Sequence, residues 1–570
     1  MRRSVPILIL ALGACGGGDQ EEHPTGPAAV TVLHYDYAFD LESRAAAVVA
    51  TLRVDAPGDC VSLPMRAGGL EDVLLGGEPI TDGALEDGVL SACGRGWEAG
   101  EEVALEAHMV VALETWGDSQ VGYSVATDAE GAPFHYLVSW VGGCDRFGPC
   151  DRAPDRFATY RFTVSHPPGV QVLCPGALSP GEGETVCDLG LAAPTYSAFG
   201  LAAGPSWVEV PLGDWGGIAA TLHDMPAVDM APAIDADAHA RFVAWMSERF
   251  GPYPYGDALR LFVGPTYWSG FEHPGNIALS DTLHLAPSSY ADAVTHVINH
   301  EIAHQWAGDH TTLASERDFV WKEAMAEYLS FVFEEEALSA EDGLATARAW
   351  KAFARGAAFH PVPDEEDAPL LDWYGDVYGP GPMILFRQLE GLFGREAVLA
   401  AIAELIGGEE PAARSVDDVR AALEAATGAD LAGYFDTWIH GGGAPTWPVF
   451  EVTWTQTRAG PLTYTVRQSA PAAPLHGCAF SVAFTRDAQR AEAWIDLGVD
   501  GAAEVTGTIE PGFRATAAVL DPDGHCLAYA PAAAAAPVRR RNPWVVQERA
   551  CSPGTGTSSM PSTRSSSCSR

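Results

Sequence analysis

Two histidines and a glutamate lie at a spacing that suits metal binding. The run His300-Glu301-Ile302-Ala303-His304 occurs in an apolar stretch patterned like a helix, and Glu323 follows after eighteen intervening residues. Because residues four apart lie on one face of a helix, both imidazoles could bind one ion while Glu301 projects beside it. Two imidazoles and a carboxylate are a donor set of catalytic zinc, which keeps water in its fourth position. We therefore predict a zinc site made by the two histidines and Glu323, with Glu301 as the general base of a hydrolysis reaction.

Two helices are expected to position these residues. The first should begin after Ser288 or Ser289, which are candidate N-caps. The second should begin at Ser315, because Asp318 completes a capping-box pattern three residues later. Glu323 then lies about two turns into the second helix, where it faces the first. The bare five-residue pattern also arises by accident on solvated helices, so other positions must support the site.

Two further segments make the chain resemble the membrane alanyl aminopeptidase family of zinc metallopeptidases, which are gluzincins. Ser269-Gly270-Phe271-Glu272-His273 stands where the family has Gly-x-Met-Glu-Asn, and Tyr378-Gly379-Pro380-Gly381 resembles its Tyr-x-Lys-Gly. The resemblance implies that Gly270 and Glu272 bind the substrate, with the Glu272 carboxylate on its free α-amine. It also implies that the Tyr378 phenol stabilises the tetrahedral oxyanion. Taken alone, Tyr378 would be a loop aromatic and Glu272 a surface acid.

The chain departs from this family around the expected site, and the departures bear on specificity. They are Phe271 for Met, His273 for Asn and Pro380 for Lys in the two motifs, Lys322 and Ala324 beside Glu323 where Asn and Gly are usual, and Trp140 where a Gln or Glu helps to bind the amine. None of them removes a residue needed for the zinc chemistry. They make strict recognition of a free amine less secure.

These patterns together predict a zinc-dependent metallopeptidase with one zinc per chain and peptides as substrates. We expect an aminopeptidase, in which Glu301 takes the proton of a zinc-bound water and passes it to the leaving amine. One open alternative is a gluzincin hydrolase without strict amine recognition, similar to an endopeptidase. Another is a non-catalytic surface lipoprotein of the same fold.

The first residues have the pattern of an export signal. Arg2 and Arg3 precede an apolar core, and Leu12-Gly13-Ala14-Cys15 resembles a bacterial lipoprotein cleavage box. We expect residues 1–14 to be removed and a lipid on Cys15 to anchor the protein in the bacterial cell envelope, on the periplasmic side or at the cell surface. An ordinary signal peptide with an incidental cysteine is the alternative. No later stretch approaches the roughly eighteen to twenty apolar residues that a membrane span needs.

Charge and cysteine content limit the partners and the compartment. The 76 acidic and 33 basic residues give a formal charge of −43, which argues against nucleic acid as a partner. Such a charge would attract cationic peptides, although an acidic surface that serves solubility is the preferred explanation. The eleven cysteines suit an oxidising compartment. The expected disulfide pairs are Cys60 with Cys93, Cys144 with Cys150, Cys174 with Cys187, and Cys478 with Cys526, although sequence does not fix connectivity. The oligomeric state is not indicated.

Periodicity divides the chain into an α+β multidomain protein. After a flexible tether at residues 15–27, residues 28–210 have the short β-branched runs of an N-terminal β-sheet domain. Residues 211–445 are mainly helical and match a thermolysin-like catalytic domain, with a cleft-edge strand expected near Leu259–Val263. Residues 446–530 return to a period of two and should form a small C-terminal β-sandwich. Residues 531–570 should be a disordered tail.

Six further helices are expected in the catalytic domain from their 3.6-residue periodicity. They run over Ala238–Phe250, Ala340–Phe353, Pro382–Phe393, Arg395–Ile406, Val416–Ala426 and Leu431–His440.

Overall fold

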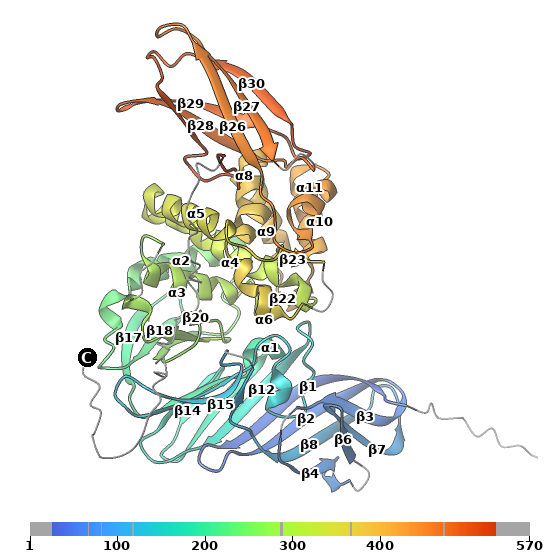
Figure 1. Ribbon diagram of the computed structural model, residues 1–570. Helices are drawn as coiled ribbons and strands as arrows, with labels where there is room; N and C mark the ends of the chain where they lie inside the picture. Colours follow the sequence, from blue (N-terminus) through green and yellow to red (C-terminus); the bar gives the residue numbers. More distant parts are fainter. Residues whose placement is uncertain are drawn as a thin grey trace, which may run out of the picture.

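The computed structural model describes most of the chain and confirms the expected α+β multidomain fold. The described residues are 26–66, 68–80, 83–116, 119–285, 289–364, 368–470 and 474–531. The expected signal peptide, Cys15 and nearly all of the expected tail lie outside them. Figure 1 shows the N-terminal sheets at one end, the helical region in the middle and the C-terminal strands at the other end. Within the described ranges, no helix is long and apolar enough to cross a membrane.

The N-terminal region consists of three sheets. The largest has eight strands in the order β14 (Ala177–Pro180), β15 (Glu184–Pro194), β12 (Phe157–Ser165), β1 (Ala29–Asp40), β2 (Ala45–Ala56), β8 (Glu102–Val110), β4 (Leu70–Leu75) and β5 (Glu78–Pro79). The second comprises β13 (Gln171–Leu173), β16 (Gly200–Gly204), β11 (Pro133–Val138), β10 (Gly122–Thr127) and β9 (Glu114–Thr115), and the third β3 (Gly58–Pro64), β7 (Val89–Trp97) and β6 (Gly83–Glu86). Side chains along β8 alternate between buried and partly exposed, as in a strand with one face on the core.

All four expected disulfide pairs are confirmed. Cys60 and Cys93 link β3 to β7, and the other three bonds are Cys144–Cys150, Cys174–Cys187 and Cys478–Cys526. The first three lie in the N-terminal region and the fourth in the C-terminal region. Each of these bonds therefore closes a loop within one region of the fold.

A five-stranded sheet begins the catalytic region, in the order β17 (Val208–Asp214), β18 (Ala219–Asp224), β19 (Ala258–Gly264), β21 (Asn276–Ser280) and β20 (Gly270–Phe271). The boundary expected between residues 210 and 211 therefore falls inside β17. The prediction of a cleft-edge strand near Leu259–Val263 is wrong, because β19 pairs with β18 on one side and with β21 on the other. The edge strand next to α3 (Ala293–His304) is β20, which pairs only with β21 in this sheet.

The predicted helices are present, with small differences at their ends. They are α2 (Ala236–Phe250), α3, α4 (Phe319–Phe333), α5 (Ala340–Ala354), α9 (Arg395–Ile406), α10 (Val416–Thr427) and α11 (Ala432–Trp438). The segment expected as one helix from Pro382 is instead α7 (Pro380–Pro382), a π-helical turn η7 (Met383–Arg387) and α8 (Gln388–Phe393). Shorter elements are α1 (Thr195–Ala198), α6 (Leu370–Trp373), the π turn η5 (Glu334–Leu338), and the two-stranded sheets β22 (Thr311–Leu313) with β24 (Ala412–Arg414) and β23 (Val362–Pro363) with β25 (His440–Gly441).

The starts of the two site helices differ from the predicted caps. Asp292 caps α3, because its carboxylate accepts hydrogen bonds from the backbone N–H groups of Val294 and Thr295. Ser289 therefore does not cap α3, and Ser288 lies outside the described residues. Ser315 precedes a 3-10 turn, η4 (Glu316–Asp318), and makes no side-chain cap bond to the backbone there. The capping box is thus not formed, because the Ser315 hydroxyl donates to the Asp318 carboxylate at 2.7 Å instead of accepting a backbone N–H.

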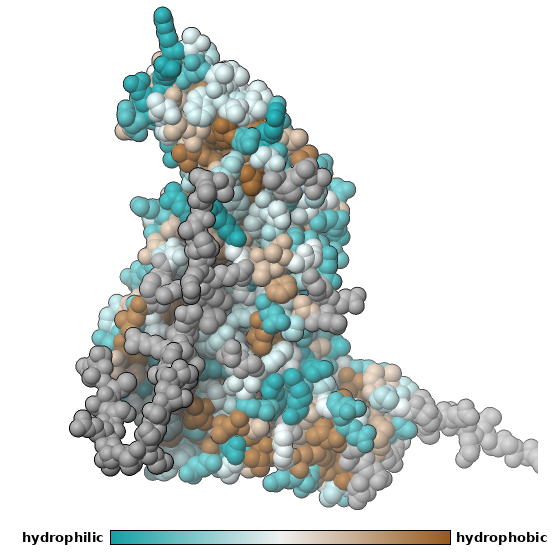
Figure 2. Space-filling model, viewed as in Figure 1, coloured by the Kyte–Doolittle hydropathy of each residue, from teal (hydrophilic) through white to brown (hydrophobic). Residues whose placement is uncertain are grey.

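The C-terminal region is the expected β-sandwich. One sheet has β26 (Val449–Gln456), β27 (Leu462–Ala470) and β30 (Glu504–Ile509), and the other has β29 (Gln489–Asp496), β28 (Ala479–Arg486) and β31 (Ala517–Leu520). Aromatic rings connect the two sheets, with Phe450 at 5.2 Å from Phe480 and Trp454 at 5.9 Å from Phe484. In the view of Figure 2, the outer end of this sandwich is hydrophilic.

Candidate active site

The structure brings the three predicted metal ligands together between α3 and α4. His300 and His304 lie one turn apart on α3, and Glu323 lies on α4, which packs against α3. Glu323 Oε2 is 3.2 Å from His300 Nε2 and 3.3 Å from His304 Nε2, and the two Nε2 atoms are 2.9 Å apart. Ligand atoms arranged tetrahedrally around zinc are separated by roughly 3.3–3.6 Å. The observed triangle is within a few tenths of an ångström of this size, so the residues fit a metal ion.

A hydrogen bond fixes the tautomer of His304 that metal binding requires, and a nearby carboxylate favours the same tautomer of His300. His304 Nδ1 lies 3.0 Å from the carbonyl oxygen of Ala307, which only accepts, so Nδ1 carries the proton. His300 Nδ1 faces Glu327 Oε1 at 3.5 Å. A proton on Nδ1 leaves the lone pair on Nε2, the atom that points at Glu323 in both rings. Carboxylates behind metal-binding histidines commonly fix ring orientation in this way.

A buried network lies behind His300. Glu327 accepts hydrogen bonds from Trp350 Nε1 at 2.6 Å and contacts His296 Nε2 at 3.2 Å, while His296 Nδ1 lies 2.6 Å from Glu334. Burial alone would lower the pKa of His296, but the Glu334 and Glu327 carboxylates outweigh it and raise the pKa to about 10. Sequence reasoning missed Glu327, although its position one turn after Glu323 was a usable signal.

Glu301 can lie against the backbone of β20 because Gly270 has no side chain there. A Cβ atom on Gly270 would lie 2.6 Å from Glu301 Cγ and would overlap the carboxylate. Glu301 is buried, and burial together with the Glu272 and Glu323 carboxylates raises its pKa well above the usual range. A carboxylate with a raised pKa is suited to accept a proton and give it back.

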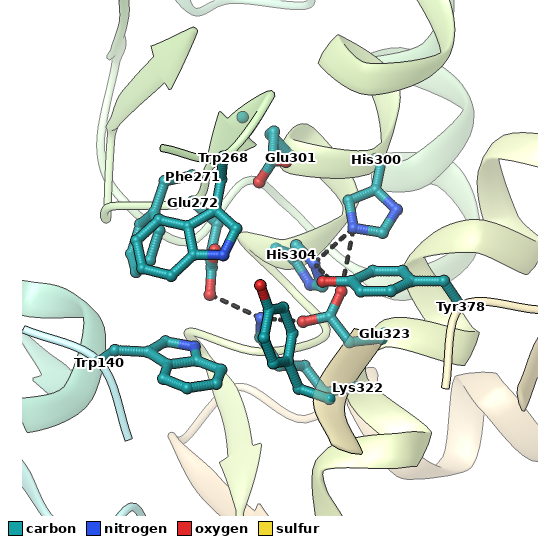
Figure 3. A pocket seen from close by; sticks show the side chains of 12 residues that line it. Trp140, Trp268, Phe271, Glu272, His300, Glu301, His304, Lys322, Glu323 and Tyr378 are labelled. Atoms are coloured by element: carbon teal, nitrogen blue, oxygen red, sulfur yellow. Dashed lines mark hydrogen bonds and ion pairs between the residues drawn. The ribbon is translucent and has the colours of Figure 1, made fainter. Parts of the chain in front are cut away.

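Aromatic side chains form the rest of the cleft wall, as Figure 3 shows. The ring of Tyr378 lies 6.3 Å from the ring of His300, so the predicted oxyanion residue faces the metal ligands. Burial raises the pKa of Tyr378, which keeps the phenol protonated and able to donate a hydrogen bond. Trp140, Trp268 and Tyr374 also line the cleft. Trp140 follows β11 of the N-terminal region, which therefore forms part of the site.

Glu272 is paired inside the protein. Its Oε1 lies 2.6 Å from Lys322 Nζ, and the same ammonium lies 2.7 Å from Glu323 Oε1. Burial would raise the pKa of Glu272, but Lys322 outweighs it, and the pKa is lowered. Glu272, Glu301 and His304 could also hold a cation by their spacing, but the Lys322 ammonium would repel it. The sequence indicated Lys322 only as a departure beside the third ligand.

His273, which replaces the family's Asn, has a structural role. Its ring contacts the Tyr136 hydroxyl at 2.8 Å and the Ser197 carbonyl at 2.8 Å, so it joins the Glu272 segment to the N-terminal region. Burial lowers the pKa of His273 to about 4. Gln305 supports the same segment from α3, because its side chain donates to the Glu272 carbonyl and accepts from the Gly275 N–H.

This fold and this site define a gluzincin, in which a His-Glu-x-x-His helix is completed by a glutamate from the next helix. Residues 234–438 match the Peptidase family M1 domain. The comparisons therefore support a gluzincin of the alanyl aminopeptidase family.

Two curated relatives agree with this assignment. The chain is 26% identical to aminopeptidase N of Streptomyces lividans over 347 residues, which are 56% of this chain and 39% of that protein. It is 26% identical to leucine aminopeptidase 2 of Chaetomium globosum over 211 residues, which are 36% of this chain and 33% of that protein. The chain thus spans well under half the length of these relatives.

Solved structures have the same fold. An M1 zinc metallopeptidase from Deinococcus radiodurans superposes with a TM-score of 0.59 at 20% identity, covering 74% of this chain and 95% of that one. Aminopeptidase A of Legionella pneumophila superposes with a TM-score of 0.67 at 14% identity, covering 89% of this chain and 60% of that one.

Proposed function

We propose that this protein is a zinc-dependent aminopeptidase that removes N-terminal residues from peptides, with one zinc per chain. The observation that carries the proposal is the convergence of His300 Nε2, His304 Nε2 and Glu323 Oε2, with Glu301 and Tyr378 beside them. The relatives named above are aminopeptidases, and related structures were determined with L-tryptophan, L-arginine or a Tyr-Ser-Ala substrate. Peptides are therefore the substrate class that we assign.

Each residue of the site has a separate role in the proposed reaction. Bound zinc would supply a Lewis acid and lower the pKa of its water. Glu301 accepts the proton of the attacking water and returns it to the leaving amine. Tyr378 donates a hydrogen bond to the oxygen on which charge develops. Glu272, with Gly270 beside it, lies where the amine end of the substrate is expected. A non-catalytic role is not favoured, since every one of these positions is filled.

Metal content and hydrolysis test the proposal together. Purified protein is expected to contain one zinc per chain and to cleave aminoacyl fluorogenic substrates in preference to their N-acylated forms, with loss of activity on chelation. The Glu301→Gln variant should keep its zinc but lose about a hundred- to ten-thousandfold in turnover, because an amide does not accept the proton. Protein without zinc, or zinc-loaded protein that does not cleave aminoacyl substrates, would refute the proposal.

We also propose that the protein is exported and anchored in the cell envelope through a lipid on Cys15. The sequence Leu12-Gly13-Ala14-Cys15 supports this, and the four disulfides suit an oxidising compartment. The Cys15→Ser variant should leave the membrane fraction, because the acyl chains supply the anchoring. Unchanged membrane association of this variant would count against a lipid at Cys15.

A further inference from the structure

A third histidine lies on the face of α3 that carries the metal ligands. His296 is four residues before His300, just as His300 is four residues before His304, so the three rings follow one another along one side of the helix. The His296 side chain is only 1% exposed, and both of its ring nitrogens face carboxylates. Nδ1 lies 2.6 Å from Glu334 and Nε2 lies 3.2 Å from Glu327. His296 therefore joins two acidic side chains behind the first metal ligand.

These contacts give His296 a positive charge. An ionised carboxylate only accepts hydrogen bonds, so a ring that meets carboxylates at both nitrogens carries a proton on each. Tyr290 stacks on the ring with 3.8 Å between ring centres, and an aromatic face stabilises a cation. With one positive and two negative charges, this buried group has a net charge of −1.

Glu327 is held so that one of its oxygens faces His300. Its Oε2 accepts the Trp350 Nε1–H at 2.6 Å and faces His296 Nε2 at 3.2 Å. Its Oε1 is thereby turned toward His300 Nδ1, which lies 3.5 Å away. Glu327 is fully buried, so its charge acts on His300 with little screening by water.

The other carboxylate is anchored to the same helix as Trp350. Glu334 Oε1 faces His296 Nδ1, and its Oε2 accepts the Thr346 hydroxyl at 2.7 Å. Thr346 and Trp350 lie one turn apart on α5, so this helix holds both carboxylates in place. The His296 ring is thus fixed at both nitrogens, and rotating it would break a buried ion pair.

We propose that His296 is a positioning residue for the metal site and that it acts on His300 through Glu327. Its charge and its Nε2–H keep the Glu327 carboxylate ionised and oriented although that carboxylate is buried. Glu327 in turn orients the His300 ring and makes its Nε2 a stronger donor to a metal ion. The inference rests on the proposed function, because it concerns the affinity of the site for zinc.

A purely structural role for His296 would give a different pattern of losses. His296 also connects α3 to α4, so its removal costs stability whatever it does for the metal. If His296 acts through Glu327, however, replacing both residues should weaken zinc binding no more than replacing Glu327 alone. If the two residues act independently, the two losses of affinity should multiply.

Zinc affinities measure this coupling. The affinity of the metal-free full chain is determined by competition with a chromophoric chelator for wild type, Glu327→Gln, His296→Leu and the double variant, with thermal melting recorded for each. Glu327→Gln should weaken binding by about ten- to a hundredfold. His296→Leu should weaken it as well, and the double variant should bind as Glu327→Gln does. His296→Gln should lie between wild type and His296→Leu, because its amide still donates to Glu327 but carries no charge.

His239→Leu is the matched control. His239 is fully buried on α2, and its Nδ1 lies 2.8 Å from the amide oxygen of Asn299, next to His300 on the zinc helix. It therefore supports the same helix but pairs with an amide instead of carboxylates. Its replacement should lower the melting temperature and leave zinc affinity unchanged. The visible absorption of cobalt-loaded protein should change in Glu327→Gln and His296→Leu but not in this control.

The outcomes separate this inference from the proposed function. Wild type that does not bind zinc refutes the proposed function itself. Zinc-binding wild type with unchanged affinity in Glu327→Gln or His296→Leu overturns only the inference, as do multiplied losses in the double variant or an equal loss in the control. If His296→Leu does not fold, His296→Gln takes its place in the double variant, and the same coupling is required of it.

Discussion

At the scale of single residues, Gly270 has its role because it lacks a side chain. It lies on the edge strand β20, where the Glu301 carboxylate packs directly over its backbone. The general base is therefore positioned by the helix that carries it and by a gap in the facing strand. Lys322 acts in the opposite way, because it fills space beside Glu272 that a smaller residue would leave open.

The Gly270→Ala variant tests the positional argument. The added methyl overlaps Glu301, so the carboxylate must move by about 1 Å, and a displacement of that size costs about a hundredfold in turnover. Zinc content should not change, since His300, His304 and Glu323 are untouched. The control is Gly433→Ala on α11, where a Cβ atom meets nothing within 4 Å. Full activity of Gly270→Ala would show that the Glu301 carboxylate can move without loss of turnover, which would contradict the positional argument.

Local spacing predicted the metal ligands and the general base, whereas Gly270, Glu272 and Tyr378 were predicted from the family resemblance. His300, Glu301 and His304 follow from one helical turn, and Glu323 from the next helix. The contacts of Lys322 were not predictable, because Glu272 lies fifty residues away and the packing of β20 against α3, and of α3 against α4, brings them together. The hydrogen bond between His273 and Tyr136 spans 137 residues and depends on how the N-terminal sheets dock.

At the scale of elements, the helices were predicted better than their starts. The predicted helix Arg395–Ile406 matches α9 at both ends. Glycines at 394 and 407 flank a stretch in which apolar residues recur at helical spacing without interruption. The start of α3 was predicted wrongly because the segment contains several residue types that cap helices, and periodicity does not choose among them. The position of β19 inside its sheet depends on strand order, which no local pattern encodes.

Replacing the cap of α3 should destabilise the zinc helix locally. Asp292→Ala removes acceptors for the N–H groups of Val294 and Thr295 and for the Thr295 hydroxyl, a loss worth about 1 kcal/mol. Hydrogen exchange of these two amides should become faster by about fivefold. Ser289→Ala is the matched control and should have no effect. We expect these two amides to exchange faster in the Asp292 variant than in the Ser289 variant. The reverse order would contradict the assigned cap.

At the scale of the whole molecule, the site lies where two regions of the fold meet. Tyr196 of the N-terminal region donates a hydrogen bond to the Gly308 carbonyl at 2.8 Å, and Ser197 donates to Asp309 at 2.6 Å. Arg260 on β19 donates to the carbonyls of Cys174 and Gly176. These bonds fix the wall that carries Trp140 against the metal helices, so cleft shape and docking of the N-terminal sheets are coupled.

Stability of the whole molecule should fall on mild acidification. Burial lowers to about 4 the pKa of four histidines in separate parts of the fold: His223, His239, His273 and His476. The unfolded chain binds protons at an ordinary pKa of about 6.5, so between pH 6.5 and 4 it holds more protons than the folded chain. The free energy of unfolding therefore decreases as pH falls through this window, by up to about 1.4 kcal/mol per histidine and pH unit.

His296 acts in the other direction, which places the optimum near pH 6.5. Its pKa is raised to about 10, so its contribution is complete below pH 6.5 and is lost as pH rises from 6.5 to 10. Denaturant midpoints of the metal-free protein, measured from pH 4.5 to 10, should therefore pass through a maximum. The His476→Asn variant should have a shallower acid limb than wild type, since one buried titrating group is gone. A wild-type midpoint that stays constant between pH 6.5 and 4.5 would contradict the burial of these histidines as neutral rings.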